Sequence, residues 1–185
     1  MTELSPPGAF VRAYPDLAPA LRAWAVLRCR GPLGRALEAD DLVQEVCLEA
    51  MAAEERFDPA RGEFRPWLFG IASRVASNAL RRLARGRLLP ADTSLASRTG
   101  RLPADVTTVS RRVRHDEAVS AFLRDLDELD EDDRRLLVHR GIEALEHAEI
   151  AALLGISAEN AAKRWQRLRE RVAAWPTARS VLADC

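Results

Sequence analysis

The stretch from Asp40 to Arg85 decides the fold. It opens with DDLVQEVCLEAM (residues 40–51), turns at RFDPARGEF (56–64) and continues as RPWLFGIASRVASNALRRLAR (65–85). In the first segment the apolar residues share one helix face, formed by Leu42, Val43, Val46, Cys47, Ala50 and Met51. In the last segment the apolar stripe is formed by Phe64, Leu68, Ile71, Val75 and Ala79. This stretch predicts two amphipathic helices, joined by a turn that contains Asp58, Pro59 and Gly62.

The two predicted helices carry opposite charge. Seven acidic residues and no Lys or Arg lie between Glu38 and Glu55. Between Arg56 and Arg87 there are eight Arg against Asp58 and Glu63, a local charge of +6. The formal net charge of the 185-residue chain is zero, so the blocks indicate more about partners than the whole does.

The bulk composition is that of a globular intracellular protein. Lys163 is the only lysine; the Arg bias suits phosphate contacts, although genome composition favours the same bias. Cys29, Cys47 and Cys185 lie far apart, which predicts reduced thiols, with Cys47 buried. No apolar run approaches membrane-spanning length and no leader is evident. We therefore expect a cytoplasmic protein without membrane insertion.

The first predicted domain covers residues 9–87. It begins with a helix from about Phe10 to Arg30, whose regular part Pro15 and Pro19 should confine to its later turns. Residues 88–115 contain few apolar side chains, which predicts a flexible linker.

The second predicted domain covers residues 116–176, and residues 177–185 are expected to form a frayed tail. The run DEDD (130–133) predicts a helix N-terminus with an N-cap, and that helix should end near Gly141. A helix ending at Gly155 and a longer cationic helix capped by Ser157 then form a helix-turn-helix pattern. The fold class is therefore all-α: two small helical domains joined by a flexible linker, the second containing a helix-turn-helix.

Both cationic segments fit nucleic acid. A helix that opens at Ser157 points its N-terminal residues at base edges, and its Arg side chains face phosphates; a solvated cationic face in an ordinary bundle is the alternative. Aromatic residues interleaved with Arg between Arg56 and Arg74 suit unstacked single-stranded bases, unless the aromatics fill the core.

Catalysis has little support in the sequence. His139, Glu143 and His147 have helical i, i+4, i+8 spacing, but Gly141 lies within that span. No nucleophile–base pair, phosphate-binding glycine loop or metal-ligand cluster is present in the pattern. We expect no catalytic residue, metal or cofactor.

Three blocks, DLVQEV (41–46), RFDPARGEFRPWLFGIASRVASNALRR (56–82) and RRLLVHRGIEALEHAEIAALLGIS (134–157), together resemble the extracytoplasmic-function group of bacterial RNA polymerase sigma factors. The resemblance covers roughly residues 10–175. It implies a non-catalytic protein that binds core RNA polymerase and directs promoter recognition and transcription initiation. An anti-sigma protein is a further expectation of the family.

The resemblance also implies roles for individual residues. The polymerase-binding helix corresponds to Asp41, Gln44 and Glu45. The segment that melts the minus-ten element and captures an extruded base of the non-template strand corresponds to Asp58, Arg61, Phe64, Arg65, Trp67, Arg74, Asn78, Arg81 and Arg82. The helix that contacts duplex DNA at the minus-thirty-five element corresponds to Ser157, Asn160, Lys163, Arg164, Gln166, Arg167 and Arg169.

Two positions depart from the family pattern. Arg74 stands where relatives usually have Asn, and Ala162 replaces a familiar basic contact, with Lys163 about 100° further round the helix. These departures concern which promoter is recognised.

The linker length supports separated DNA-binding domains. The 29 residues from Arg87 to His115 span at most ~95 Å extended but only about 30 Å as a relaxed coil. Promoter elements 20–25 base pairs apart are separated by about 70–85 Å, which leaves roughly 50–65 Å for the linker after each domain's radius. We infer that polymerase holds the domains apart, and that the isolated chain is more compact and binds promoter DNA poorly. The alternative is a stand-alone helix-turn-helix regulator whose first domain senses a signal or dimerises.

Overall fold

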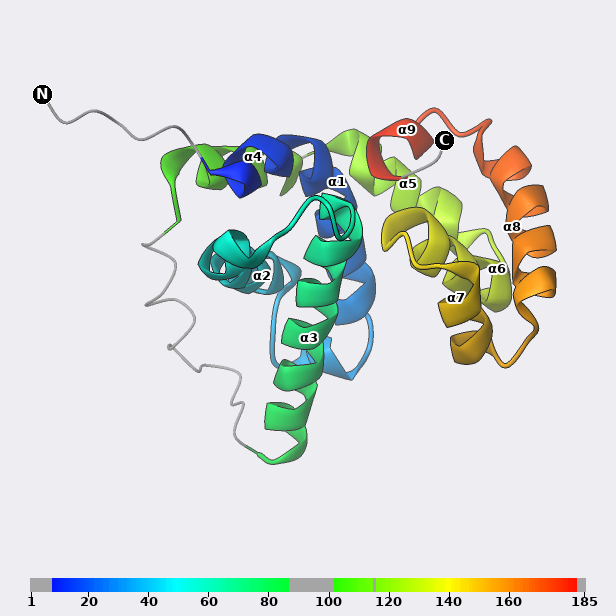
Figure 1. The fold of residues 1–185 in the computed structure, drawn as a ribbon, viewed down its shortest axis with the longest axis horizontal. Coiled ribbons are helices and arrows are strands. Elements are labelled where there is room, and N and C mark those ends of the chain that lie inside the picture. The colour runs from blue at the N-terminus through cyan, green and yellow to red at the C-terminus, as the bar shows by residue number, and fades with distance from the viewer. Residues whose placement is uncertain (1–7, 87–101, 115, 183–185) are drawn as a thin grey trace, which may run out of the picture.

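Helices α2 (Ala39–Ala53) and α3 (Phe64–Ala84) are the two helices that the charge pattern predicts. They pack against each other in the computed structural model, which describes residues 8–86, 102–114 and 116–182 (Figure 1). In these ranges every regular element is a helix, and no strand is present. The predicted all-α class is confirmed.

Helix α1 (Ala9–Cys29) crosses both prolines without interruption, so the prediction that they limit its regular part is wrong. Pro15 and Pro19 each remove one backbone hydrogen bond, at a cost of about 3 kcal/mol in an ordinary helix interior. Burial of the face that contains Phe10 and Tyr14 offsets this cost. Their rings stack at a centroid distance of 5.2 Å and both are almost fully buried.

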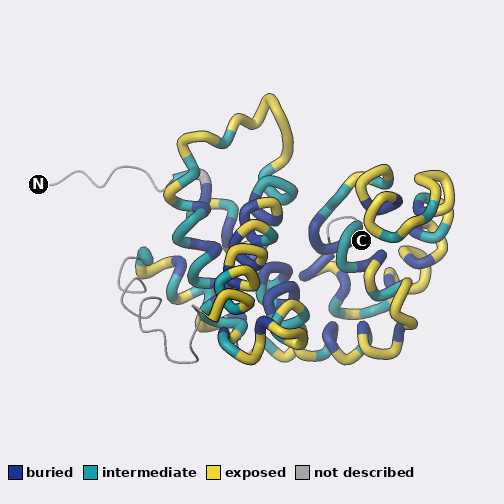
Figure 2. The backbone as a smooth tube through the Cα atoms, turned by 90° about the horizontal axis from the view of Figure 1, so that it is seen from below, coloured by how far each residue is buried: buried dark blue, intermediate teal, exposed yellow. Residues whose placement is uncertain are grey.

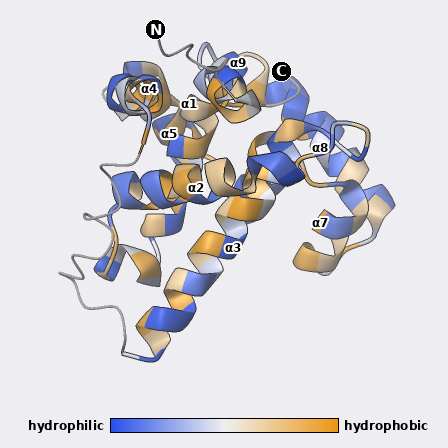
Figure 3. Ribbon diagram, turned by 60° about the vertical axis from the view of Figure 1, so that its left-hand side comes forward, coloured by the Kyte–Doolittle hydropathy of each residue, from blue (hydrophilic) through white to orange (hydrophobic). Residues whose placement is uncertain are grey.

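The first domain closes around the middle of α1. Trp24 is fully buried, and its ring meets that of Phe69 edge-on at 6.1 Å. Leu42 from α2 and Leu68 from α3 complete this core. Two short 3-10 turns, η1 (Pro32–Arg35) and η2 (Glu54–Arg56), connect the helices. Figure 3 shows the hydrophobic and hydrophilic bands that alternate along α3, as an amphipathic helix requires.

The predicted linker is partly helical. Residues 87–101 and 115 lie outside the described part, but Ala104–Arg114 form helix α4, which packs on α1. Val106 and Val113 are buried there, and the Tyr14 and Ser110 hydroxyls are hydrogen-bonded at 2.6 Å. Composition alone suggested a flexible segment because two valines cannot form a core by themselves; here α1 supplies the rest of it.

The second domain consists of α5 (Glu117–Asp127), α6 (Glu131–Leu136), the π-helical turn η4 (Leu137–Ile142), α7 (His147–Leu154) and α8 (Ala158–Val172). Its sequence-predicted caps are confirmed. Asp130 accepts a hydrogen bond from the Asp133 amide at 2.9 Å, and Ser157 accepts one from the Asn160 amide at 3.2 Å. Gly155 ends α7 with φ of 67°, a left-handed conformation that glycine adopts without strain.

The prediction of a frayed tail from residue 177 is wrong for the residues up to Leu182. Helix α9 (Ala178–Val181) packs against α1 and α5, and Ala178, Val181 and Leu182 are buried. Residues 183–185 lie outside the described part. A four-residue helix has no amphipathic period of its own, so no pattern in the sequence predicts it.

The two domains are in contact. Helix α1 packs against α2, α3 and α4 of one side and against α5, η4 and α9 of the other, so it forms the boundary between them (Figure 1). Figure 2 shows buried backbone inside both domains and exposed backbone along their outer turns.

Candidate nucleic-acid and polymerase interfaces

The loop between α2 and α3 is shaped by its own backbone. The Asp58 carboxylate accepts a hydrogen bond from the Ala60 amide at 3.0 Å. The backbone carbonyl of Asp58 accepts one from the Arg61 amide, also at 3.0 Å. This turn leaves Asp58 and Arg61 exposed. The acidic and basic side chains predicted to contact the minus-ten element are thus presented on a fixed loop.

Three aromatic rings gather at the base of this loop. The centroids of Phe57, Phe64 and Trp67 lie 5.0–5.2 Å from one another, and Phe64 also packs on Phe10 at 6.3 Å. Phe64 is therefore part of the packing that joins loop and core. Trp67 is half-buried and remains accessible on one side, which is the exposure that a stacking platform for a base needs.

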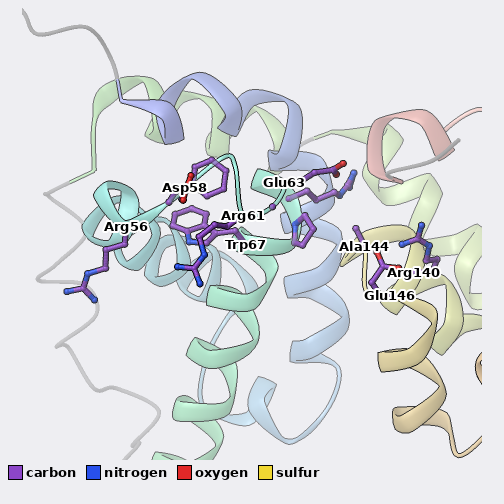
Figure 4. Close-up of a pocket in the computed structure, with 12 residues that line it drawn as sticks. Arg56, Asp58, Arg61, Glu63, Trp67, Arg140, Ala144 and Glu146 are labelled. Atoms are coloured by element: carbon purple, nitrogen blue, oxygen red, sulfur yellow. The ribbon is translucent and has the colours of Figure 1, made fainter.

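A cavity of about 830 Å³ opens beside Trp67 and is lined by both domains. The first domain contributes Arg56, Phe57, Asp58, Arg61, Gly62, Glu63, Arg65, Pro66 and Trp67. The second contributes Arg140, Ala144 and Glu146, which face these residues from the other side (Figure 4). The second group was not among the predicted site residues, because a contact between domains leaves no periodic signal in the sequence. Of the predicted minus-ten residues, this cavity brings together Asp58, Arg61, Arg65 and Trp67.

Arg65 lies between the two domains. Its Nε donates to the Ile142 carbonyl at 3.0 Å, and its Nη2 donates to the Val181 carbonyl. The guanidinium also lies 5.9 Å from the Phe69 ring centroid. In this arrangement the Arg65 cation is directed at backbone carbonyls of the second domain.

The other predicted minus-ten residues lie further along α3, away from the cavity. Arg74, Asn78 and Arg81 are exposed, and Arg82 is half-buried. Arg81 donates to the Asn78 side chain one helical turn away. These side chains form a separate polar strip on the outside of the first domain.

The predicted polymerase-binding face is less open than expected. Asp41, Gln44 and Glu45 are all half-buried, and the neighbouring Asp40 forms an ion pair with Arg22 at 2.9 Å. The exposed carboxylates of the acidic segment lie at its ends, at Glu38 and Glu55. Packing of α2 against α1 accounts for this partial cover.

Helix α8 buries Ala161, Trp165, Leu168 and Val172. The predicted DNA-contacting residues on its other face are exposed: Ser157, Asn160, Lys163, Gln166, Arg167 and Arg169. Arg164 is the exception. It is half-buried and lies 3.3 Å from Asp132 and 3.4 Å from Asp133, and Asp133 also pairs with Arg171 at 2.7 Å.

These ion pairs give Arg164 partners within its own domain. Its contacts run back to α6 and help to hold α8 on the domain. Lys163 pairs with Glu159 at 2.6 Å, but both side chains are largely exposed, so the pair is weak and can exchange for a phosphate.

The one buried charged residue of the described ranges is Glu143, which is 3% exposed. Its Oε1 accepts from Trp24 Nε1 at 2.6 Å and from Arg28 at 2.7 Å, and its Oε2 lies 2.7 Å from His139 Nδ1. Burial alone would raise the pKa of Glu143, but the contacts with His139, Arg28 and Trp24 outweigh it, so the pKa is lowered.

These partners bear on the metal hypothesis. His139 and Glu143 do meet, but the carboxylate is occupied by two donors from α1. Across residues 8–86, 102–114 and 116–182, no group of three or more His, Cys, Asp or Glu could hold a metal ion.

Cys47 is buried as predicted. Burial raises the pKa of its thiol to about 12, although a hydrogen bond with Tyr14 lowers it in part. Burial likewise raises the pKa of Tyr14 above its ordinary value. No helix within the described part is both long and apolar enough to cross a membrane.

Comparison with known proteins identifies the family. Residues 13–86 match Sigma-70 region 2, and residues 121–172 match Sigma-70, region 4. The ECF RNA polymerase sigma factor SigD of Mycobacterium tuberculosis is 30% identical over 147 residues, which are 77% of this chain and 67% of SigD. The ECF RNA polymerase sigma factor EcfG of Rhodopseudomonas palustris is 29% identical over 156 residues, 84% of this chain and 78% of EcfG. No solved structure matches.

A two-domain, helix-turn-helix protein with these matches belongs to the Sigma-70 family of transcription initiation factors. Within that family the chain is an ECF sigma factor, and it directs promoter recognition and transcription initiation by RNA polymerase. The family is non-enzymatic. The domain that the alternative interpretation treated as a sensor or dimerisation unit matches region 2.

Proposed function

We propose that three surfaces of this sigma factor divide the work of initiation. The α2 face with Asp41, Gln44 and Glu45 binds core RNA polymerase. The loop and helix from Asp58 to Arg82 melt the minus-ten element and hold its non-template strand. Helix α8 binds duplex DNA at the minus-thirty-five element. The domains that carry these surfaces are residues 9–87 and 116–176, joined by the segment 88–115, with α9 added to the second domain.

The observation that carries the minus-ten assignment is the cavity beside Trp67. Arg61 places an exposed cation on its first-domain wall for phosphate, and half-buried Trp67 offers a ring on which a base can stack. A base extruded from the duplex needs both at once. Arg65 adds a second cation once it leaves the carbonyls of Ile142 and Val181. The outer strip of Arg74, Asn78 and Arg81 then follows the strand further along α3.

Helix α8 suits duplex DNA for a different reason. Asn160 and Gln166 are exposed amides, which pair with adenine edges in the major groove, and Arg167 and Arg169 are exposed on opposite flanks of the helix for phosphate contacts. Arg164 is assigned a holding role in the isolated chain, since its guanidinium is directed at Asp132 and Asp133.

A factor with this function requires no catalytic residue and no cofactor of its own, because polymerase performs the chemistry. It acts in the cytoplasm, where polymerase meets the chromosome. An inhibitory anti-sigma protein would have to cover the α2 face or the DNA-binding surfaces to be effective.

Run-off transcription with core polymerase on genomic fragments tests the proposal. The wild-type chain should produce defined transcripts, and a Trp67→Ala variant should lose them while still binding polymerase in pull-down. Defined transcripts from polymerase alone, or a Trp67→Ala variant that starts transcription as well as wild type, would contradict it.

A further inference from the structure

The contact between the domains contains an uncommon feature, a carboxylate buried at the boundary. Glu143 belongs to the second domain, yet two of its donors, Trp24 Nε1 and Arg28, belong to α1 of the first. A buried charge is tolerated only where hydrogen-bond donors surround it. The carboxylate can therefore stay buried only while α1 lies against η4.

Two further contacts cross the same boundary. Arg65 of α3 donates to the carbonyls of Ile142 and Val181, and Arg30 at the end of α1 pairs with Asp127 at the end of α5. The Arg30 pair is exposed and so contributes little. Arg65 is different because its partners are backbone groups of two separate elements, η4 and α9, and it fixes both to α3.

The position of Arg65 has a functional cost. A guanidinium that donates to two protein carbonyls has fewer donors left for a phosphate. It also lines the cavity beside Trp67, so the second domain closes one side of the surface that the minus-ten strand would occupy. The same contact that joins the domains thus withdraws a DNA-binding residue and narrows its site.

We propose that Glu143, through Trp24 and Arg28, holds the isolated sigma factor in a closed state in which Arg65 is withheld from the non-template strand. We name the contact formed by Trp24, Arg28 and Glu143 the Glu143 contact. This inference rests on the proposed minus-ten function of Arg65 and adds its regulation. Polymerase opens the chain because it binds the separated domains and so shifts the population toward the open state.

The size of the effect follows from the population of the open state. When only a small fraction of the chain is competent to bind, the apparent affinity for a ligand falls by that fraction. If the closed state holds all but a few per cent of the molecules, a variant that opens the chain should bind single-stranded DNA about tenfold or more tightly.

The main test uses the full chain with Glu143→Gln, which removes the charge but keeps the shape. Arg28→Gln is a second variant; its side chain is 40% exposed, so the change removes one donor and leaves no new buried group in α1. Glu128→Gln is the matched control, an exposed glutamate of the same domain. Circular dichroism establishes that each variant is folded.

Two measurements report opening. Small-angle X-ray scattering gives the radius of gyration, and the indole N–H resonance of Trp24, assigned with Trp24→Phe, reports the hydrogen bond to Glu143. Both Glu143→Gln and Arg28→Gln should enlarge the radius and shift this resonance, and Glu128→Gln should do neither. If Glu143→Gln and Arg28→Gln are both folded but keep the wild-type radius of gyration, the proposal is overturned, whatever the Trp24 resonance does, because that resonance also responds to the change of its acceptor.

A third measurement connects opening to Arg65. A dye-labelled pool of single-stranded DNA 12-mers of randomised sequence is titrated with each variant and followed by fluorescence anisotropy. Glu143→Gln should gain about tenfold in affinity, and adding Arg65→Ala should remove the gain. An opened chain without a gain, or a gain that survives Arg65→Ala, would overturn the link between Glu143 and Arg65.

Transcription separates this inference from the function on which it rests. An Arg65→Ala holoenzyme that initiates like wild type defeats the minus-ten role of Arg65, and the inference falls with it. If the Arg65→Ala holoenzyme is defective but the Glu143→Gln chain stays closed, the minus-ten function of Arg65 stands. In that case only the proposed role of the Glu143 contact is defeated.

Discussion

Trp24 Nε1 and Glu143 Oε1 lie 2.6 Å apart although 119 residues separate them in the sequence. One is at the centre of the region 2 core and the other at the end of the π-helical turn of region 4. A single hydrogen bond therefore reports whether the two halves of this sigma factor are together. The hypothesis that the isolated chain is more compact than its promoter-bound form requires such contacts between the halves.

The pH dependence of this contact has a defined direction. The pKa of Glu143 is lowered from its ordinary 4.5, so the charged form contributes stability that is fully present above pH 4.5 and is lost as pH falls through the lowered pKa. We expect the difference in unfolding free energy between wild type and Glu143→Gln to shrink as pH falls below 4.5. Urea titrations of both proteins from pH 8 to pH 3 measure this difference. His139 contacts Glu143 directly, so the same pair of titrations in a His139→Gln background separates the carboxylate from the imidazole; a difference that grows as pH falls below 4.5 in that background would contradict the assignment.

Replacing Trp67 by Ala should weaken capture of the minus-ten strand. Base–aromatic stacking contributes about 1–3 kcal/mol, so open-complex formation should fall by roughly 5- to 150-fold at subsaturating holoenzyme. Permanganate footprinting of the melted region measures it. Trp67→Phe, which keeps an aromatic ring beside Phe57 and Phe64, should retain most of the activity. Equal loss in both variants would point to disturbed packing of the ring cluster instead.

Reversing charge on α2 should separate the factor from polymerase. Asp41→Arg with Glu45→Arg replaces two half-buried carboxylates with cations, and we expect the holoenzyme yield in size-exclusion chromatography to be lost. Glu117→Arg with Glu128→Arg adds the same charge to exposed positions at the start of α5 and at its C-cap, and should leave the yield unchanged. An intact holoenzyme from the α2 variant would remove that helix from the interface.

The salt dependence of DNA binding tests helix α8. If Arg167 and Arg169 each contact a phosphate, the double Ala variant should reduce the slope of log K against log salt by about 2. Arg124→Ala, at an exposed position of α5 outside the helix-turn-helix, should not change it. Anisotropy titrations of holoenzyme on minus-thirty-five duplex at several salt concentrations give the slopes.

Two glycine substitutions test the packing with opposite expected signs. A Cβ on Gly141 would lie 2.8 Å from Leu182 Cδ2 and 3.3 Å from the Trp165 ring, whereas one on Gly70 meets nothing within 4 Å. We expect Gly141→Ala to destabilise by about 1–3 kcal/mol and Gly70→Ala, inside α3, to stabilise by up to about 1 kcal/mol. Urea unfolding measures both. A neutral Gly141→Ala would show that Leu182 does not pack as described.

The sequence was sufficient where a feature is local. The periods of α2, α3 and α8, the caps at Asp130 and Ser157 and the break at Gly155 depend on neighbours a few residues away, and each is found as predicted.

It was insufficient where the partner is remote. Helix α1 continues through two prolines because distant residues bury Phe10 and Tyr14. Helix α4 buries its valines against α1, which is remote in the sequence. Glu143 has the spacing of a metal ligand with His139 and His147, but its carboxylate instead accepts hydrogen bonds from Trp24 and Arg28. The partners of Arg65 and Arg164 belong to the same group. Each is a contact between segments whose separation no pattern of spacing encodes.

Helix α4 has a consequence for promoter architecture. Its 11 residues cover about 16 Å as a helix but about 36 Å when extended, a difference of about 20 Å, or roughly six base pairs of DNA. Whether this helix survives in the initiation complex therefore sets the longest spacer that the factor can bridge. A bacterium could alter the set of genes under its control by mutating Ser110 or Val113, without touching a single residue that meets DNA.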